Sequence, residues 1–346
     1  MAYSSVTNPR NFMNTVLYTG NSGTQSITSL DFQPDWCWFK ARNNTDTHGV
    51  FDSVRGVTKR IIPNNNTAEG TQSNGLTHFL SNGFTVGDAG IVNQGYNYAS
   101  WNWKAGTSFT NDASSTGIGT IDSTGSVNDT AGFSICTHTG TGSNATIKHG
   151  LSTAPKVIIT KKTSASGGWQ VGHESIGWQN GIYLEDTGAS TGDAGAWNST
   201  APTSSIFYVG TSSFTNQSSA TYVSYIFSEK QGYSKFGSYI GNGNANGPFI
   251  NLGFKPAFIM AKKSSDTGGW QLRDNKRTPT GNLTNNLMYA NATSVEQTTD
   301  GVDFLSNGWK LRNSAGDSNA SGATYIYMAF AEEPFVASNF NTATAK

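Results

Sequence analysis

Apolar residues along the chain form short runs and do not show the spacing of an amphipathic helix. The runs PDWCWFK (34–40), KVIITKK (156–162) and AFIMAKK (257–263) are rich in aromatic and branched side chains and end at Lys. Such runs are typical of buried strands. Clusters such as NG, GG, SG and GNG separate them and supply the positive φ that tight hairpins need. The pattern predicts an all-β fold with frequent turns and only brief helices.

The same order of residues occurs three times, in segments that begin at Val16, Ser134 and Phe236. Each segment has a glycine turn, a proline, a lysine six residues later, and a histidine or tryptophan fourteen residues after the proline. These residues are Gly20, Gly140 and Gly241; Pro34, Pro155 and Pro256; Lys40, Lys161 and Lys262; His48, Trp169 and Trp270. The closing strands also match: Tyr98, Trp101 and Trp103; Tyr222, Tyr225 and Phe227; Tyr325, Met328 and Phe330. Repetition of this kind indicates copies of one supersecondary unit.

We therefore expect three tandem antiparallel β-sandwich repeats. The predicted divisions are an N-terminal arm (1–11), repeat one (12–106), a Ser/Thr/Gly-rich linker (107–130), repeat two (131–231), repeat three (232–335) and a C-terminal tail (336–346). Repeats two and three follow each other directly, so we expect them to be rigidly joined. The linker composition predicts that repeat one moves relative to the other two.

Composition and charge narrow the range of partners. Charged residues make up 13% of the chain, and 22 basic residues balance 22 acidic ones. With no net charge there is no broad attraction to nucleic acid or anionic lipid, so we expect neither as a partner. The opening residues, MAYSSVTNPR, lack the basic and apolar regions of a signal peptide, and no window is apolar enough to cross a bilayer. We expect no secretion signal and no membrane insertion.

The two cysteines, Cys37 and Cys136, fall in different repeats at positions that do not correspond. Because residues in separate domains rarely meet, we expect both thiols to be unpaired. Isolated buried thiols are typical of a protein that folds in a reducing cytoplasm.

Acidic residues at roughly matched positions are the strongest candidates for catalysis. Asp52, Glu174 and Asp274 lie in FDSVRG, GHESIG and RDNKRT. Recurrence in every repeat favours a structural role, in which each carboxylate accepts hydrogen bonds from a turn. His173 and Ser175 flank Glu174, but the segment lacks a nucleophile elbow. We predict no catalytic residues.

Metal and cofactor sites are also not indicated. The turns VGDAG, STGDAG and AGDSNASG lack the alternating ligands of an EF-hand, although calcium at these turns stays an alternative. The five histidines show no zinc-ligand spacing, and IGNGNANG lacks the lysine and helix of a phosphate-binding loop. We predict no metal and no cofactor.

Aromatic residues divide into two groups. Those at matched positions are expected in the core. Trp178, Tyr183 and Trp197 have no counterpart in the other repeats and lie in polar loops of repeat two, within GWQNGIYLEDTGASTGDAGAWNST. We interpret these three as contacts for a glycan or a protein partner. The alternative is that the loops are buried against a neighbouring repeat.

Several phrases together resemble a domain family found in tailed bacteriophages, in proteins labelled as tail fibre, tail-tip or other structural components. They include FQPDWCWFKAR, FDSVRG, FLSNGFTVG, WNWKAG, HGLSTAPKVIITKK, GYSKFGSYIGNG, GFKPAFIMAKK, DNKR and YIYMAFAEEPF, and the resemblance covers residues 12–335. It implies a virion protein that assembles in the host bacterial cytoplasm, and a concanavalin-like jelly roll or related sandwich. It implies no catalytic residues.

Two kinds of function fit this resemblance. The first is a tail-fibre or tail-tip component that binds host-surface glycan or protein. The second is a capsid decoration protein, or a tail assembly adaptor, that binds other virion proteins. In both cases we expect an oligomer on the particle. A polysaccharide depolymerase is a more distant alternative.

Overall fold

The fold is built almost entirely from antiparallel strands. The computed structural model describes residue 4, residues 6–278 and residues 283–334, and the predicted C-terminal tail lies outside these residues. Within them, every ladder between named strands is antiparallel. Helices are single turns: η1 (Pro9–Asn11), α1 (Gly90–Asn93), α2 (Ala113–Thr116), η2 (Glu174–Ile176), α3 (Ala194–Trp197) and α4 (Gly316–Asn319). The prediction of an all-β fold with brief helices is confirmed.

One arrangement of four strands occurs in each repeat. The last strand of the repeat lies between its first and third strands, and the fourth pairs with the third. In sheet order the strands are β1 (Met13–Thr19), β9 (Asn97–Trp103), β3 (Trp36–Ala41) and β4 (Gly49–Asp52); β12 (Phe133–Thr139), β19 (Thr221–Phe227), β14 (Val157–Lys162) and β15 (Trp169–His173); and β20 (Ser234–Ile240), β27 (Thr324–Pro334), β22 (Phe254–Lys263) and β23 (Trp270–Asp274). We call each set the inner sheet of its repeat.

Outer strands pack on one face of each inner sheet and make the sandwich. They are β2 (Gln25–Ile27), β8 (Gly83–Val86) and β7 (Leu76–Leu80) in repeat one; β13 (Ala145–Lys148) and β18 (Ile206–Val209) in repeat two; and β21 (Phe249–Asn251), β26 (Gly308–Leu311), β25 (Gln297–Leu305) and β24 (Leu283–Tyr289) in repeat three. Short strands complete the edges: β5 (Lys59–Arg60), β6 (Gly70–Thr71), β16 (Asn180–Tyr183) and β17 (Thr191–Gly192). Each repeat has its own apolar core between these two layers.

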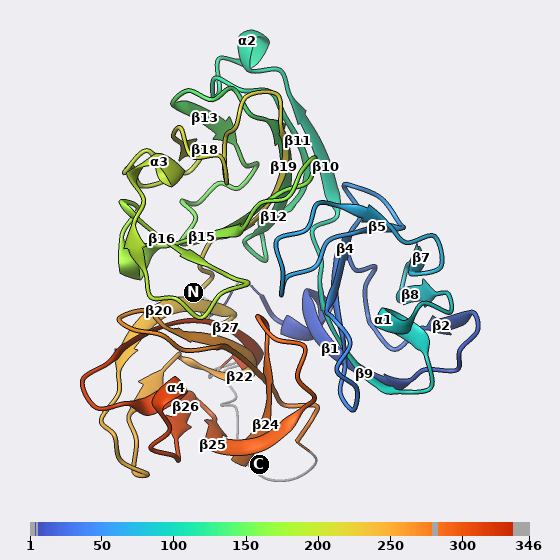
Figure 1. The fold of residues 1–346 in the computed structure, drawn as a ribbon, viewed down its shortest axis with the longest axis vertical. Helices are drawn as coiled ribbons and strands as arrows, with labels where there is room; N and C mark the ends of the chain where they lie inside the picture. Colours follow the sequence, from blue (N-terminus) through green and yellow to red (C-terminus); the bar gives the residue numbers. More distant parts are fainter. Residues whose placement is uncertain (1–3, 5, 279–282, 335–346) are drawn as a thin grey trace.

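The opposite faces of the three inner sheets meet in one central core that contains residues of all three repeats. Three ring contacts join the repeats in pairs, with centroid separations of 4.5 Å for Trp36–Tyr225, 5.5 Å for Trp103–Phe258 and 5.8 Å for Phe227–Phe330. Figure 1 shows the repeats as three lobes around a common centre. The expectation that repeat one moves independently is wrong, because its inner sheet is buried against the other two.

The segment 107–130 is not a linker in this structure. It forms β10 (Thr107–Asn111), the turn α2 and β11 (Ser123–Asn128), and β11 pairs along β12 at the edge of the inner sheet of repeat two. Its Ser/Thr-rich composition was misleading because hydroxyl side chains also suit a strand whose faces are partly exposed. We call residues 107–128 the arm. The other repeat boundaries stay predictions.

Both cysteines are buried and unpaired, as predicted. Cys37 lies in the core of repeat one and Cys136 in the core of repeat two. Burial raises the pKa of each thiol above its ordinary value, to about 12 for Cys136. Neither therefore has the thiolate character that a reactive cysteine needs.

Candidate functional site

The matched lysines are buried and bind backbone carbonyls. In repeat two, Lys161 Nζ donates to Asn66 O of repeat one at 3.1 Å. In repeat three, Lys262 Nζ donates to Gly188 O of repeat two at 2.8 Å, whereas Lys40 binds Asn44 O within its own repeat. Burial lowers the pKa of each amine to about 8. A depressed lysine pKa can mark a nucleophile, but these amines are enclosed and already hydrogen-bonded.

The residues fourteen positions after the matched prolines form a cyclic set of contacts between repeats. Trp169 Nε1 donates to Ile62 O of repeat one, and Trp270 Nε1 donates to Tyr183 O of repeat two, both at 2.8 Å. His48 Nε2 of repeat one contacts Tyr289 O of repeat three at 3.1 Å. Each repeat thus holds a neighbour in the same direction around the centre.

The tautomer of His48 follows from its other ring nitrogen. Trp38 Nε1 donates to His48 Nδ1 at 2.8 Å, so Nε2 carries the hydrogen and is the donor to repeat three. Complete burial lowers the pKa of His48 to about 3. The imidazole is therefore neutral and structural at ordinary pH.

The candidate acids of repeats one and three also join the repeats. Asp52 accepts from Tyr225 OH of repeat two at 2.7 Å, and Asp274 accepts from Trp101 Nε1 of repeat one at 2.9 Å. Each carboxylate also accepts from the backbone N–H and the guanidinium of the arginine three residues later, Arg55 or Arg277. The predicted structural role, in which the carboxylate accepts hydrogen bonds from a turn, is confirmed for these two residues.

In repeat two the corresponding residue is His173, not Glu174. Strand register places His173 opposite Val157, as Asp52 is opposite Trp36. His173 Nε2 contacts Tyr327 O of repeat three at 3.2 Å. Glu174 lies outside, where it pairs with Lys156. Glu174 is one residue beyond the position that matches the two aspartates. Because successive strand residues point to opposite faces, it is His173 and not Glu174 that points toward the neighbouring repeat.

The interpretation of Trp178 and Trp197 as surface contacts is also wrong. They are 6% and 0% exposed, and their rings meet edge-on at 5.9 Å in the core of repeat two. Both rings approach the position that a Cβ on Gly172 would occupy, so this glycine makes room for them on the sheet. The described outer layer of repeat two has fewer strands than those of the other repeats, and the two indoles fill the space. Sequence alone hid this, because a polar loop can fold back over a sheet.

Tyr183 is half-buried, with its ring edge-on to Phe214 at 5.2 Å. Its carbonyl is the acceptor for Trp270 described above. Tyr183 thus contributes to the joint between repeats two and three. It shares no exposed surface with Trp178 and Trp197, because both indoles are buried.

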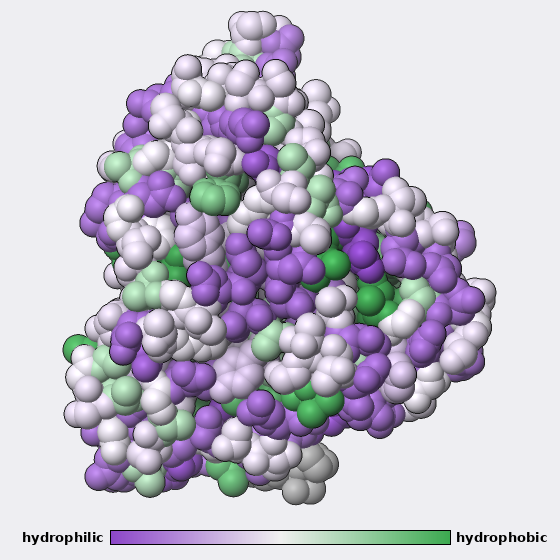
Figure 2. Space-filling model, in the orientation of Figure 1, coloured by the Kyte–Doolittle hydropathy of each residue, from purple (hydrophilic) through white to green (hydrophobic). Residues whose placement is uncertain are grey.

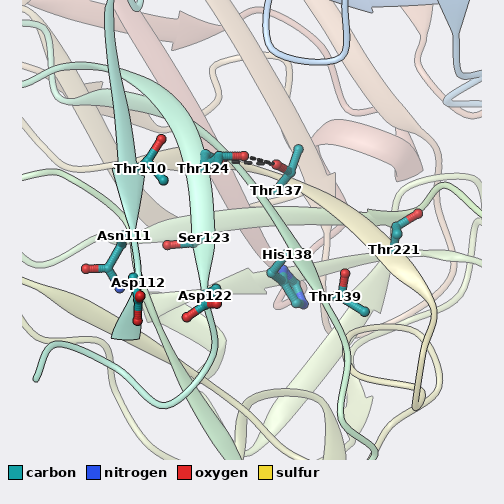
Figure 3. Close-up of a pocket in the computed structure, with 10 residues that line it drawn as sticks. All are labelled: Thr110, Asn111, Asp112, Asp122, Ser123, Thr124, Thr137, His138, Thr139 and Thr221. Carbon is teal, nitrogen blue, oxygen red and sulfur yellow. Dashed lines mark hydrogen bonds between the residues drawn. The ribbon is translucent and has the colours of Figure 1, made fainter. Parts of the chain in front are cut away.

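A polar groove of about 370 Å³ opens where the arm meets the inner sheet of repeat two. Figure 3 shows its lining, which comes from β10, β11, β12, β19 and the turn between β10 and β11: Thr110, Asn111, Asp112, Asp122, Ser123, Thr124, Thr137, His138, Thr139 and Thr221. The hydroxyls of Thr124 and Thr137 lie 2.8 Å apart across the two strands. Hydrogen bonds from Ser114 and Ser115 hold the pKa of Asp112 below its usual range, so this exposed carboxylate is charged at neutral pH.

The floor of the groove is structural. His138 stacks on Tyr222 at 5.0 Å, and the corresponding residues of repeat one, Tyr18 and Tyr98, stack at 5.2 Å. His138 Nε2 contacts Thr215 O at 3.0 Å, and burial lowers the pKa of the imidazole to about 4. His138 is therefore a neutral counterpart of a core tyrosine. The groove offers hydroxyl and carboxylate groups to a ligand, an arrangement suited to binding a polyhydroxyl molecule.

Sequence reasoning missed these groove residues because it treated the arm as a linker. A signal was present in Ser108 and Thr110, which lie on either side of Phe109 as exposed residues of a strand would. Within the described residues, no three His, Cys, Asp or Glu side chains gather as metal ligands would. Among the same residues there is no helix of the length and apolarity needed to cross a bilayer.

Comparison with known proteins adds a family but no activity. The family model described as "Domain of unknown function (DUF7483)" matches residues 8–334. The match therefore runs through all three repeats and the arm. No curated protein matches the chain.

Proposed function

We propose that this chain, which belongs to the DUF7483 family, is a non-enzymatic structural protein of a tailed-phage virion. It assembles in the host bacterial cytoplasm and serves in a tail fibre or tail tip, where it binds a host-surface glycan or protein. The virion assignment depends on the resemblance of the chain to phage structural proteins. The binding role depends on the groove beside the arm.

The observation that carries the binding role is the contrast between matched and unmatched polar residues. Matched polar residues such as Lys161, Asp52 and Asp274 are enclosed in contacts that hold the repeats together. The exposed threonines and aspartates of the groove hold no repeats together, and among the residues that the structure describes a segment like the arm lies only beside repeat two. A feature present in one of three copies is not required by their common fold.

The chemistry of the groove favours a neutral glycan. Threonine hydroxyls donate and accept hydrogen bonds, and the carboxylates of Asp112 and Asp122 accept from pairs of sugar hydroxyls. A volume of about 370 Å³ lies within the range of small-molecule pockets and suits a short saccharide. The chain has no net charge, so attraction to a strongly charged polymer is not favoured.

A glycan array with matched variants tests this role. Thr110→Tyr places a bulky ring in the groove, whereas Thr298→Tyr makes the same change at an exposed strand position of repeat three. We expect the wild type and Thr298→Tyr to bind the same glycan and Thr110→Tyr to bind it about ten-fold more weakly or worse. If no glycan binds, or if Thr110→Tyr binds unchanged, the glycan role is wrong.

A second role, capsid decoration or tail assembly, is favoured by exposed apolar side chains at strand edges outside the groove, such as Ile240 and Phe249. Exposed apolar edges are typical of surfaces that pair with other subunits. Cryo-electron microscopy of particles that carry the protein would separate the two roles. Density at the tail tip or a fibre supports host binding, whereas density on the capsid supports decoration.

A further inference from the structure

The arm fills a seam between the two layers of repeat two. On one side, β11 pairs with β12 over six residues, from Ser123–His138 to Asn128–Phe133. On the other side, the amides of Thr120 and Ile121 donate to Thr146 O of β13 at 2.8 and 3.1 Å. Ile121 is only 6% exposed and lies in the core of repeat two. An extended segment is thus held by two strand edges and one apolar anchor.

Repeat three has the same two walls without a described segment between them. Tyr239–Tyr325 is the counterpart of His138–Tyr222, which aligns β20 with β12. In the same way, Ile250–Trp309 is the counterpart of Ile147–Phe207 and aligns β21 with β13. Within residues 6–278 and 283–334, β20 pairs only with β27 and β21 only with β26. We call the space between the edges of β20 and β21 the open seam.

Backbone groups of β20 point into the open seam. The amide of Gly241 donates to Ala323 O toward β27, so the amides of Ile240 and Ser238 alternate away from β27. The next outward amide, that of Phe236, is capped by Glu229 at 3.2 Å. Among the described residues no partner exists for the outward amides of Ser238 and Ile240. Unpaired strand groups of this kind are a template for another strand.

One end of the open seam is closed in the same way as in repeat two. Lys235 Nζ donates to Asn251 O across the seam at 2.9 Å. Ser134, the counterpart of Lys235, donates to His149 O at 2.6 Å. Beside this end is a hollow of about 390 Å³ that includes Gly232, Leu252 and Gly253. Because the amide of Phe236 is also capped, the open part of the seam extends from Gly237 to the end of β20.

The side chains at the edges of the open seam are apolar, whereas those at the edges of the seam that the arm fills are polar. Ile240 and Phe249 of the open seam are 64% and 43% exposed, and Ile240 is the most exposed large apolar side chain in the described residues. Their counterparts in the filled seam are Thr139 and Thr146. An arm that belongs to the same chain needs no added attraction, whereas a strand from another molecule gains affinity from apolar contact.

We propose that the open seam binds an extended strand of another protein, antiparallel to β20, in the way the arm binds β12. The arm supplies the chemistry of the partner: small hydroxyl residues and glycine along the strand, as in STGSVN, with one aliphatic side chain before them. The main-chain bonds give affinity, the aliphatic anchor enters between the two layers as Ile121 does in repeat two, and Ile240 and Phe249 add apolar contacts beside the bound strand. The proposal holds whether or not the groove of repeat two binds glycan.

A synthetic peptide with the arm sequence GIGTIDSTGSVND (117–129) tests the seam in the full chain. We expect saturable binding by fluorescence anisotropy, with hydrogen-exchange protection that appears at β20 and β21. Ser238→Pro removes an outward amide without removing a bond to β27, and Ile240→Lys removes the apolar contact. Each is expected to weaken binding at least about ten-fold, whereas Leu283→Lys, an exposed apolar position elsewhere, leaves it unchanged.

Three results would overturn the proposal. These are absence of saturable peptide binding, binding that Ser238→Pro and Ile240→Lys leave unchanged, and protection at β1 without protection at β20. Sedimentation of the wild type tests whether a second copy of the chain occupies the open seam. A concentration-dependent dimer that Ser238→Pro converts to a monomer would identify a second copy of the chain, and would contradict a foreign strand as the partner. None of these results bears on the groove, which lies on repeat two.

Discussion

The seam of repeat two and the open seam of repeat three have corresponding walls but different contents. In repeat two the arm lies between β12 and β13, and the wall residues Thr139 and Thr146 are polar. In repeat three the space between β20 and β21 is unfilled by described residues, and the wall residues Ile240 and Phe249 are apolar and exposed. Copies of one fold thus diverge where they meet an additional strand, and stay alike where they meet one another.

At the centre of the molecule, the three repeats make similar hydrogen bonds to one another. Asp52 and Asp274 each accept a hydrogen bond from an aromatic residue of a neighbouring repeat, and His173 takes their place in repeat two. These contacts are enclosed, and the central core lies beside them. We therefore expect substitutions at the centre to affect stability most, and substitutions at the open seam to affect binding while stability changes little.

The largest effect is expected at Asp274. Asp274→Ala removes one of the two carboxylates that pair with the guanidinium of Arg277, which is fully buried, and leaves only Glu296. Loss of one member of a buried ion pair costs about 3 to 5 kcal/mol. Urea denaturation should show this loss, while Glu174→Ala, which removes a partly exposed acid at the neighbouring position in repeat two, should cost less than about 1 kcal/mol. Equal losses in the two variants would contradict the division between centre and surface.

A pair of isoleucines compares the two seams directly. Ile121→Ala removes a buried anchor of the arm and should lower the free energy of unfolding by about 2 to 3 kcal/mol. Ile240→Ala makes the same change at the exposed edge of the open seam and should cost less than about 0.5 kcal/mol. Denaturation midpoints of both variants would check this, and a large loss in Ile240→Ala would mean that the open seam is already occupied.

A smaller effect is expected from pH at the centre of repeat two. Burial lowers the pKa of His173 to about 4, below its ordinary value near 6.5. The unfolded chain therefore binds a proton more readily than the folded one between these values, so stability falls as pH decreases from about 6.5 toward 4. Between pH 7.5 and 5 this histidine should account for about 2 kcal/mol.

The variant His173→Gln isolates that contribution. It should lose about 2 kcal/mol less than the wild type when pH is lowered from 7.5 to 5, as measured by urea denaturation at each pH. The other buried histidines, His48, His138 and His149, keep their own pH dependence in both proteins. Parallel pH profiles would contradict the lowered pKa of His173 that its burial produces.

Much of the fold could be predicted from the sequence, because it depends on local pattern. The short apolar runs indicated strands, and the repeated spacing located the buried lysines and aromatic residues. The contacts of these residues could not be predicted, because the spacing of residues within a repeat does not show that three sheets pack around one centre. Trp169, for example, reads as a core residue, yet its Nε1 donates to Ile62 of repeat one.

The candidate site was less accessible from the sequence. The polar loops around Trp178 and Trp197 predict exposure of both rings, but Gly172 makes room for them in the core. The composition of the arm predicts a linker, because composition does not distinguish a hydroxyl-rich strand from a flexible segment. The segment is a strand because β11 pairs with β12, and pairing of this kind depends on tertiary contacts.

Hydrogen exchange at three corresponding amides tests the central claim most directly. Leu17, Thr137 and Ser238 occupy the same outward position on β1, β12 and β20. Only Thr137 faces a described strand, β11, so its amide should exchange slowly while those of Leu17 and Ser238 exchange fast. Equal protection at Thr137 and Ser238 would contradict the account, because the seams of repeats two and three would then be equally filled or equally open.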